Sequence, residues 1–466
     1  MSDFKLLIDG RLEAGDRTMA VINPATEEII AQCPRASRAQ LDKAVAAANA
    51  AFPAWSSAPH AQRAAALIAA AEIAEAHSSE LGRLLTLEQG KPLKDATNEV
   101  LGMAQAFRYF ATLDLPPPNI IDQRGRKLEV RRKPLGVAGV ILPWNFPLIL
   151  VGSRVPPALI AGNTVVIKPA PTTPLATLRF AELVKDIFPP GVFNVIADAN
   201  DLGDAMTGHP GIRKISFTGS TVTGRKVMAS AANTLTRVTL ELGGNDAAIV
   251  LDDVNPKQAA PKIFSAAFGN SGQVCIALKR LYVHDSIYDE MCNELVGLAE
   301  AATVGDGLQQ GTQMGPLQNR MQFEKVKSIF EDTKSHGTIL CGGPMEGPGY
   351  FMRPAIVRDI VEGTRLVDEE QFGPVLPVLR YSDPEDALKR ANASAYGLGG
   401  SIWSADLDRA HDLAARMDTG VVWINQHMGL SHTTPFAGAK QSGVGIEMGE
   451  EGMLEFTQLQ VINAPA

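Results

Sequence analysis

The sequence predicts an α/β protein with a doubly wound parallel sheet, a second α/β unit and a small exposed sheet. Two sets of short apolar runs that alternate with helical segments predict the first two parts, and two segments of polar–apolar alternation predict the third. At 466 residues the chain exceeds what one hydrophobic core usually serves, so we expect more than one domain. Its 45% hydrophobic and 20% charged residues are typical of a folded globular protein.

The doubly wound sheet is predicted from a change of pattern near residue 137. Upstream, residues 39–78 show the Ala-rich periodicity of amphipathic helix. Downstream, apolar runs rich in β-branched residues alternate with helical segments such as 176–187, which is typical of buried parallel strands with helical crossovers. The strand candidates are 137–142, 164–167, 193–196, 214–217 and 247–250. We infer a sheet of the nucleotide-binding type.

A second set of α/β elements runs from about residue 257 to residue 425. It includes strand candidates 280–283 and 420–424 and the helical segment 384–392. Residues 127–132 and 459–462 instead alternate polar and apolar side chains, as in a small exposed sheet that pairs across subunits. The expected boundaries are 1–115 with 135–243 for the nucleotide-binding domain, 244–441 for the second domain, and 116–134 with 442–466 for the small sheet.

Charge and cysteine usage exclude several classes of protein. The net charge of −8, with no block of Lys or Arg, leaves no electrostatic footprint for nucleic acid or an anionic membrane. The four cysteines are far apart and form no C-x-x-C pair, so neither a disulfide framework nor a metal site is predicted. Residues 134–153 are uncharged, but Pro143 and Pro147 interrupt any continuous helix there. With no apolar signal core at the N-terminus, we expect a cytoplasmic protein.

Cys275 and Glu241 place a thiol and a carboxylate base in one chain. Cys275 follows the small, polar run 270–274, and Glu241 precedes Leu242-Gly243-Gly244-Asn245. A thiol reacts mainly as thiolate, so we expect a polar or electropositive niche with exposed backbone N–H groups around Cys275. A lone cysteine among apolar residues is more often a core side chain, and the surrounding motifs decide against that interpretation.

Three further segments carry polar groups at predicted strand ends. Thr218-Gly219-Ser220 opens a helix, and such a turn directs N–H groups and the helix dipole toward an anion, although turns that only cap helices are commoner. Lys168 ends a strand at a carboxyl edge where nucleotides bind, although a surface lysine has the same local pattern. Asn145 stands between two prolines, as a rigid amide donor for an oxyanion or as a capping side chain.

These segments, in this order, resemble the aldehyde dehydrogenase superfamily over essentially the whole chain. The shared landmarks are 143–147, Lys168-Pro169, 217–221, 241–245, 272–275, 370–374, Asn392 with 396–398, and 435–443. The resemblance implies a doubly wound coenzyme-binding domain, an α/β catalytic domain and a small oligomerisation sheet. It further implies NAD or NADP as cofactor, a small aldehyde as substrate, and assembly as a homodimer or homotetramer.

The resemblance also implies a role for each matching residue. Cys275 attacks the aldehyde, the Asn145 amide and the Cys275 backbone N–H hold the alkoxide, hydride passes to nicotinamide, and Glu241 activates the water that hydrolyses the thioester. Glu447 and Arg154 belong to a path for proton exit. The cofactor-binding candidates are Leu142, Trp144, Lys168, Pro171, Thr218, Gly219, Ser220, Leu242, Glu370 and Phe372. The substrate-pocket candidates are Phe146, Leu150, Val274, Ile276 and Phe436.

The chain departs from the family pattern in places that affect coenzyme and substrate. Pro171 stands where many NAD-preferring members carry Glu, which removes a hydrogen bond to the ribose and a repulsion against a 2′-phosphate. We still favour NAD over NADP, because no arginine replaces that carboxylate. Asp198 and Asn200 alter the usual glycine-rich segment. Ser153 and Arg154 replace Trp and Lys, which opens space for a larger substrate and retains a cation.

The leading hypothesis is oxidation of medium aliphatic or aromatic aldehydes to carboxylic acids, because the pocket candidates are mainly apolar. Coenzyme-A-acylating oxidation is an alternative, but such enzymes typically lack the base that Glu241 supplies. A non-catalytic binding or structural protein of the same fold is disfavoured by the joint presence of Cys275, Glu241 and Asn145. A cysteine hydrolase would normally need a histidine near Cys275.

Overall fold

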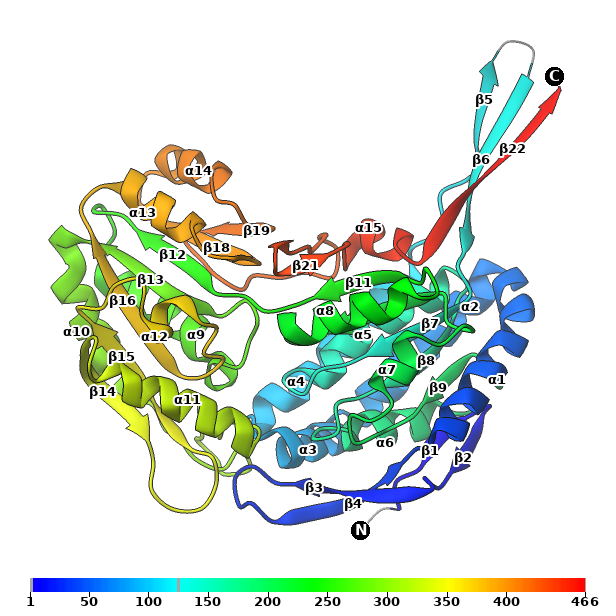
Figure 1. Cartoon of the computed structure of the whole chain (residues 1–466), viewed down its shortest axis with the longest axis horizontal. Coiled ribbons are helices and arrows are strands. Elements are labelled where there is room, and N and C mark those ends of the chain that lie inside the picture. Colours follow the sequence, from blue (N-terminus) through cyan, green and yellow to red (C-terminus); the bar gives the residue numbers. More distant parts are fainter. Residues whose placement is uncertain (1–2, 124–125, 466) are drawn as a thin grey trace.

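The computed structural model describes residues 3–123 and 126–465, which form two sheet-containing bodies side by side and a projecting three-stranded arm (Figure 1). The predicted α/β class is confirmed, with two mainly parallel sheets and a small separate one. No helix in the described ranges is long and apolar enough to cross a membrane.

The first body is built on an eight-stranded sheet in the order β2-β1-β9-β8-β7-β10-β11-β21. The five strands from β9 to β11 are parallel, whereas β1, β2 and β21 are added antiparallel at the edges. Its strands are β1 (Leu6–Ile8), β2 (Arg11–Glu13), β7 (Val137–Ile141), β8 (Thr164–Lys168), β9 (Phe193–Val195), β10 (Lys214–Thr218), β11 (Arg237–Glu241) and β21 (Gly443–Val444). The chain runs outward from β7 to β8 and β9, then returns to β10 on the other side of β7, so the sheet has a topological switch point between β7 and β10.

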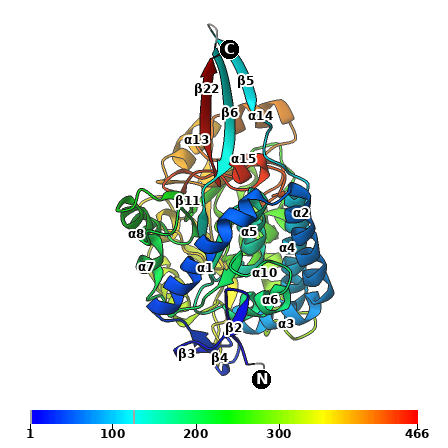
Figure 2. The same cartoon turned by 90° about the vertical axis from the view of Figure 1, so that its right-hand side faces the viewer.

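Helices cover both faces of this sheet, with α7 and α8 on one side and α2 and α4 on the other (Figure 2). The helices of this body are α1 (Arg38–Ser57), α2 (His60–Ala76), α3 (Ser78–Gln89), α4 (Leu93–Ala111), α5 (Pro147–Ile160), α6 (Leu175–Val184), α7 (Gly203–Thr207), α8 (Thr221–Ala232) and α15 (Gly449–Leu454). The helical region predicted over 39–78 is two helices, because the chain is extended at Ala58 and Pro59. Pro59 has no N–H to continue helix α1.

The second body is built on a seven-stranded sheet in the order β14-β15-β16-β13-β12-β18-β19, parallel except for the edge pair β14–β15. Its strands are β12 (Asp246–Val250), β13 (Leu278–His284), β14 (Thr338–Pro344), β15 (Met352–Arg358), β16 (Val375–Tyr381), β18 (Gly399–Trp403) and β19 (Val421–Ile424). Its helices are α9 (Pro256–Phe268), η1 (Gly269–Gly272), η2 (Asp285–Ile287), α10 (Tyr288–Ala301), α11 (Arg320–Thr333), α12 (Arg365–Asp368), α13 (Pro384–Asn392) and α14 (Leu407–Ala415).

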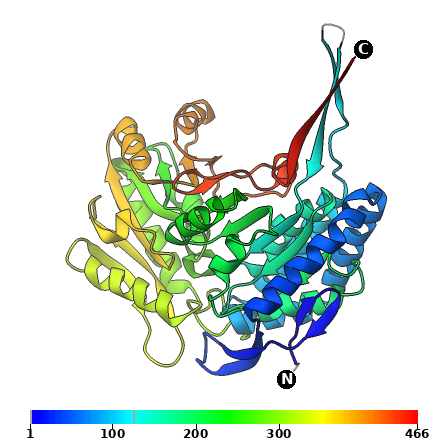
Figure 3. The same cartoon turned by 45° about the vertical axis from the view of Figure 1, so that its right-hand side comes forward.

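The third sheet is an antiparallel arm that extends well beyond the two bodies (Figure 3). Its strands are β5 (Asn119–Gln123), β6 (Arg126–Pro134) and β22 (Thr457–Pro465), with β6 in the centre. Leu459 and Val461 on β22 are 61% and 58% exposed, although both are apolar. Two further small sheets pair β3 (Arg17–Ile22) with β4 (Ile29–Arg35) and β17 (Tyr396–Gly397) with β20 (Ala439–Lys440).

The predicted boundary at residue 442 does not coincide with the sheets. Residues 443–444 form β21, which pairs with β11 at the edge of the first sheet, although 442–466 was expected to belong to the small sheet. The return to the first body places Glu447, just beyond β21, beside the end of β11. The arm begins only at Thr457 on this side of the chain.

Candidate functional site

The candidate site is a cavity of about 780 Å³ between the two bodies, at the carboxyl ends of β7, β8 and β10. This is the switch point of the first sheet, where loops from β7 and β10 diverge and leave a crevice. All of the cofactor-binding candidates line the cavity, together with Cys275 and Asn145. The volume lies in the range usual for small-molecule and cofactor sites.

The outer part of the cavity offers backbone donors suited to an anion. Helix α8 begins at Thr221, and the Ser220 hydroxyl caps it by accepting from the N–H of Thr223 at 3.2 Å. The first turn of α8 has no acidic residue, so nothing on this turn offsets the positive end of the helix dipole. The arrangement therefore fits the diphosphate of a dinucleotide.

The wall opposite α8 combines aromatic and carboxylate groups. The Trp144 and Phe372 rings meet edge to face, with centroids 5.4 Å apart. The Glu370 carboxylate accepts from the N–H of Gly244 at 2.9 Å, which fixes it at the cavity wall. Burial raises the pKa of Glu370, and the Gly244 hydrogen bond opposes that rise.

Cys275 is presented by an unusual turn that crosses from η1 into β13. Asn270, Ser271 and Gly272 are successive left-handed residues, with φ of 50°, 56° and 72°. A Cβ on Gly272 would lie 2.4 Å from the carbonyl oxygen of Gly373, so only glycine fits there. The buried Lys279 ammonium donates to the Gly272 carbonyl from beneath the turn. Strain of this kind is typical of residues held in place for function.

A glycine also allows the two bodies to meet at Cys275. A Cβ on Gly244 would lie 2.2 Å from the Cys275 carbonyl oxygen. Gly244 follows β11, the strand that ends in Glu241, so this close approach brings the end of β11 against the Cys275 turn. The structure thus places Glu241, the last residue of β11 in the first sheet, near Cys275, which precedes β13 of the second sheet.

Asn145 is buried beside this turn, and both its side chain and its backbone carbonyl are hydrogen-bonded. Its side-chain amide donates to the carbonyl of Gln273 at 3.0 Å, and its own carbonyl accepts from the ammonium of Lys91 at 2.8 Å. Lys91 also forms a buried ion pair with Glu99, whose other oxygen accepts from the N–H of Leu148 at 2.9 Å. Glu99 therefore caps helix α5 directly after Asn145, and the Lys91–Glu99 pair fixes the backbone on which Asn145 stands.

Glu241 is buried, and neither of its carboxylate oxygens has a hydrogen-bond partner among the described residues. Burial raises the pKa of Glu241 well above its ordinary value, and the neighbouring Glu447 carboxylate raises it further. The Arg154 guanidinium acts in the opposite direction. A buried carboxylate with a raised pKa and free lone pairs is suited to accept a proton.

The charged groups that act on Cys275 are mainly carboxylates, whereas a polar or electropositive niche was expected. Burial raises the pKa of the Cys275 thiol, and the carboxylates of Glu241, Asp246 and Glu370 raise it further. The backbone N–H of Ile276 acts in the other direction, and the buried Lys279 ammonium also interacts favourably with the Cys275 thiolate. The sequence around Cys275 is small and polar, but carboxylates from distant segments set its charge environment, so the thiol is protonated until a base removes its proton.

Arg154 and Glu447 form a buried ion pair on the far side of Glu241. The shortest distance between Arg154 Nη2 and the Glu447 carboxylate is 2.7 Å, and the same nitrogen donates to the Thr218 hydroxyl. The backbones of Glu447 and Phe436 exchange two hydrogen bonds of 2.7 Å each, which position Glu447 at the end of β11. Burial raises the pKa of Glu447, and Arg154 opposes that rise.

Four of the five substrate-pocket candidates gather around Cys275. Val274, Ile276 and Phe436 form one apolar cluster, and Phe146 and Cys275 pack against it. Leu150, the fifth candidate, lies on α5 and packs instead against the core of the first body. Cys275 thus packs against apolar side chains and also lies near the carboxylates that raise its pKa.

Three residues of the site were missed in the sequence. Lys91, Glu99 and Lys279 lack a motif of their own, because a lone lysine or glutamate in a polar segment has the pattern of a surface residue. Their burial is the signal, and it exists only in the folded chain: the side chains of Lys91 and Glu99 are 1% and 2% exposed. Buried charges require partners, and here the partners belong to the site.

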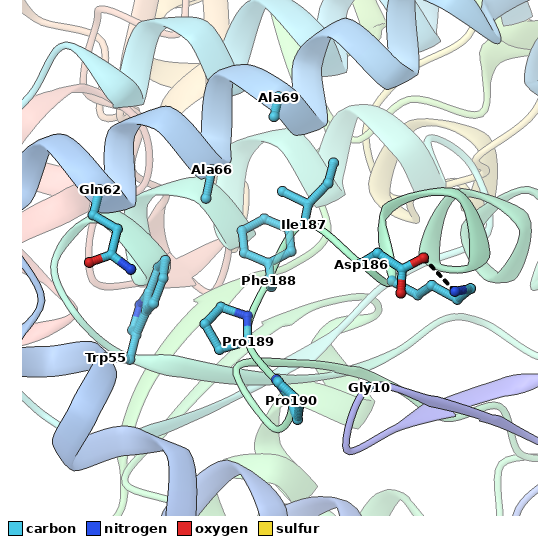
Figure 4. Close-up of a pocket in the computed structure, with 11 residues that line it drawn as sticks. Gly10, Trp55, Gln62, Ala66, Ala69, Asp186, Ile187, Phe188, Pro189 and Pro190 are labelled. Atoms are coloured by element: carbon cyan, nitrogen blue, oxygen red, sulfur yellow. Dashed lines mark hydrogen bonds and ion pairs between the residues drawn. The ribbon is translucent and has the colours of Figure 1, made fainter.

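A second hollow of about 580 Å³ lies on the first body, between α2 and the segment 185–190 (Figure 4). Trp55, Phe188 and Pro189 form its apolar lining, and Asp186 pairs with Lys185 at one side. No cysteine, serine or histidine is among the residues that line it, and Cys275 is not part of it. The cavity at the switch point is therefore the candidate site.

Fold and site together define a class: an α/β enzyme with a crevice at the switch point of a parallel sheet, lined by a thiol and an amide donor and with a buried carboxylate near the thiol. The aldehyde dehydrogenase family model matches residues 12–462, and the chain belongs to that family. The predicted membership, carried by the ordered motifs of the sequence, is thereby confirmed.

Relatives of this chain differ in the aldehyde that they are named for. Mitochondrial succinate-semialdehyde dehydrogenase of Arabidopsis thaliana is 40% identical over 98% of this chain and 88% of its own length. Phenylacetaldehyde dehydrogenase of Pseudomonas fluorescens is also 40% identical, over 95% of this chain and 91% of its own. The crystal structure of betaine aldehyde dehydrogenase from Staphylococcus aureus in complex with NAD+ has a TM-score of 0.97 at 33% identity, covering 99% of this chain and 95% of that one.

Proposed function

We propose that this protein oxidises an aldehyde to the carboxylic acid, with Cys275 as nucleophile, Asn145 as oxyanion donor and Glu241 as general base. The observation that supports the proposal is that Asn145 and Cys275 line one cavity and that the buried Glu241 carboxylate lies close enough to Cys275 to raise its pKa. NAD is the favoured coenzyme, with NADP as the alternative, and it would supply the hydride acceptor when bound.

The residues of this chain would act in sequence on the carbonyl group. Cys275 loses its proton to solvent, and the resulting thiolate attacks the carbonyl carbon. The Asn145 amide and the backbone N–H of Cys275 donate to the alkoxide of the resulting thiohemiacetal. After oxidation leaves a thioester on Cys275, Glu241 deprotonates the water that hydrolyses it. Glu447, held by Arg154, relays the proton outward.

A bound dinucleotide would be held by the outer cavity. The N-terminal turn of α8, with Thr218, Gly219 and Ser220, would receive the diphosphate. Lys168 would donate to the adenosine ribose, and Glu370 would accept from the nicotinamide ribose. The remaining candidates would pack against the coenzyme; they are Leu142, Pro171, Leu242 and the aromatic pair Trp144 and Phe372.

The substrate class proposed is a medium aliphatic or aromatic aldehyde. The apolar cluster of Phe146, Val274, Ile276 and Phe436 beside Cys275 supports this choice. The carboxylates near Cys275 weigh against an anionic semialdehyde, which would be repelled on approach. Coenzyme-A-acylating oxidation is less favoured, because Glu241 provides a base that can activate water.

We further propose that two or more copies assemble through the arm of β5, β6 and β22. Ile120, Leu459 and Val461 are exposed on its edge strands. Open strand edges and exposed apolar faces are usually covered by pairing with another chain. A cytoplasmic location is in keeping with four cysteines that are all free. Light scattering on the full chain tests the assembly, and replacement of Leu459 and Val461 by Arg should lower the measured mass.

The proposed activity is tested by following coenzyme reduction with octanal, phenylacetaldehyde and succinate semialdehyde, each with NAD and with NADP. We expect the two uncharged aldehydes to give the higher kcat/KM values. A protein that reduces neither coenzyme with any aldehyde, while Cys275 remains free to react with a thiol reagent, would contradict the proposal.

A further inference from the structure

The coenzyme-binding lysine has a carboxylate partner that the sequence analysis did not assign. Lys168 ends β8 and lines the cavity, and its ammonium lies 2.7 Å from the Oδ1 of Asp198. Asp198 is completely buried and follows β9, the strand that pairs with β8 in parallel. Its Oδ2 accepts from the N–H of Leu202 at 2.8 Å. Asp198 thus stands behind Lys168, fixed by the fold and shielded from solvent.

This pair compensates for the carboxylate that is missing at Pro171. A free, buried ammonium at the adenosine end of the cavity would attract a 2′-phosphate, which carries about −1.5 to −2 charges. With Asp198 at hydrogen-bond distance, Lys168 is part of a neutral pair. An added phosphate would then face the Asp198 carboxylate as well as the ammonium, in a region where burial limits screening.

The same pair leaves Lys168 able to bind an uncharged ribose. An ammonium has three N–H donors, and Asp198 engages one of them, so two remain for ribose hydroxyls. Arg35 and Arg17 pair with Asp201 at 2.7 and 3.4 Å and are not among the residues that line the cavity. Among the described residues that line the cavity, Arg320 pairs with Glu27, and Lys325 donates to the backbone of Glu370.

We propose that Asp198 determines coenzyme preference, by neutralising Lys168 so that the site accepts the 2′-hydroxyl of NAD and rejects the 2′-phosphate of NADP. The proposal rests on the proposed function, in which the adenosine ribose lies against Lys168. It assigns to Asp198, on the neighbouring strand, the discrimination that residue 171 cannot provide in this chain.

The test is the variant Asp198→Asn, which removes the charge and keeps the size and one acceptor oxygen. Dissociation constants are measured by calorimetry for NAD and NADP, and for AMP and adenosine 2′,5′-bisphosphate, which differ only by the 2′-phosphate and isolate the adenosine end. We expect the two 2′-phosphate ligands to bind at least about tenfold more tightly to the variant, the lower end of effects seen for close charge pairs. The affinities for NAD and AMP should change by less. An equal change for all four ligands, or none, would overturn the proposal.

Two controls separate the effect from general charge and from loss of structure. Asp201→Asn removes the same charge three residues away, where it faces Arg35, so it should leave the ratio of the NADP and NAD constants within about twofold. In the double variant with Lys168→Gln and Asp198→Asn, the gain for NADP should disappear, because it requires a free ammonium. If Asp201→Asn reproduces the gain, or the double variant keeps it, Asp198 is not the determinant.

The unmodified protein provides an outcome that does not depend on any variant folding. It should bind AMP more tightly than the 2′,5′-bisphosphate, and equal or reversed affinities would reject the role of Asp198. Absence of binding by every dinucleotide would instead reject the proposed function. Binding of NAD with aldehyde oxidation, but with no change of preference in Asp198→Asn, would reject only the inference about Asp198.

Discussion

Two buried carboxylates near the cavity differ in how their oxygens are used. Glu99 pairs with Lys91 and accepts from the N–H groups of Leu148 and Ile149, so both of its oxygens are engaged. Glu241 is as deeply buried, yet neither oxygen has a partner among the described residues. The pKa of Glu241 is raised well above its ordinary value by burial.

The contrast distinguishes a carboxylate that stabilises the fold from one that is available for chemistry. Leaving a buried acceptor unsatisfied costs about 1–3 kcal/mol, so a protein retains one only where another requirement outweighs the cost. Glu88 shows that burial alone is not the criterion: the N–H groups of Leu175 and Ala176 occupy its oxygens at the start of α6, and burial raises its pKa to about 8. Unused bonding capacity beside the thiol is what sets Glu241 apart.

The largest expected effect is at Cys275, the residue on which the proposed thioester forms. Cys275→Ser should reduce coenzyme-linked aldehyde oxidation by roughly 10⁴-fold or more, because a hydroxyl is a far poorer nucleophile and no histidine is hydrogen-bonded to it. NAD binding by calorimetry should remain within a few-fold, since the cavity is otherwise unaltered. Turnover near that of the unmodified protein would remove Cys275 from the mechanism.

Glu241→Gln tests whether an unsatisfied carboxylate is the base. Steady-state turnover should fall by roughly 10² to 10⁴, the range for loss of a general base, whereas a single burst of coenzyme reduction should persist. Because the variant removes a costly buried charge, its thermal unfolding midpoint should not fall. A turnover rate equal to that of the unmodified protein, or a lower unfolding midpoint, would show that Glu241, like Glu99, stabilises the fold and is not the base.

The raised pKa of Glu241 also sets the direction of the pH dependence. A base works only when ionised, so kcat should increase as pH rises through the raised pKa, and should be higher at about pH 9 than at about pH 6. Stopped-flow and steady-state rates across this range check the direction. In Glu241→Gln the rise in steady-state kcat should flatten, while the burst, which depends on the raised pKa of Cys275, should still become faster with pH.

Glu99→Gln should show the opposite balance of stability and activity. Breaking a buried pair leaves Lys91 uncompensated, at a cost of about 3–5 kcal/mol, so the unfolding midpoint should fall. Lys91, which donates to the backbone carbonyl of Asn145, is then no longer held in place by Glu99. We therefore expect kcat to fall by about tenfold, with little change in the KM for NAD. Chemical denaturation and steady-state kinetics measure both quantities. A loss of stability with unaltered kcat would limit Glu99 to a structural role.

The smallest expected effect is at Pro171. Pro171→Glu adds a carboxylate at the rim and should raise the KM for NADP by a few-fold, because Asp198 already provides repulsion. The added effect should shrink with salt, since exposed charges are screened over about 10 Å at 0.1 M. Parallel increases for NAD and NADP would indicate a loosened turn instead of charge repulsion, because proline restricts the local backbone.

The sequence alone determined the elements of this protein and the motifs at their ends. Strand candidates such as 164–167 and 214–217 agree with β8 and β10 to within one residue, and helix 384–392 agrees with α13. Such agreement follows from local physics, because periodicity of apolar residues decides which segments become buried strands or amphipathic helices. The order of motifs around Lys168 and Cys275 was likewise sufficient for the family.

Only the tertiary structure decided the charge environment of the site. The acidic surroundings of Cys275, the free oxygens of Glu241 and the Lys91–Glu99 support of Asn145 all join segments far apart in sequence. The partner of Lys168 is Asp198, 30 residues away, which sequence analysis noted only as a departure from a glycine-rich segment. A pKa depends on desolvation and on which charges lie within a few ångströms, and folding alone brings those charges together.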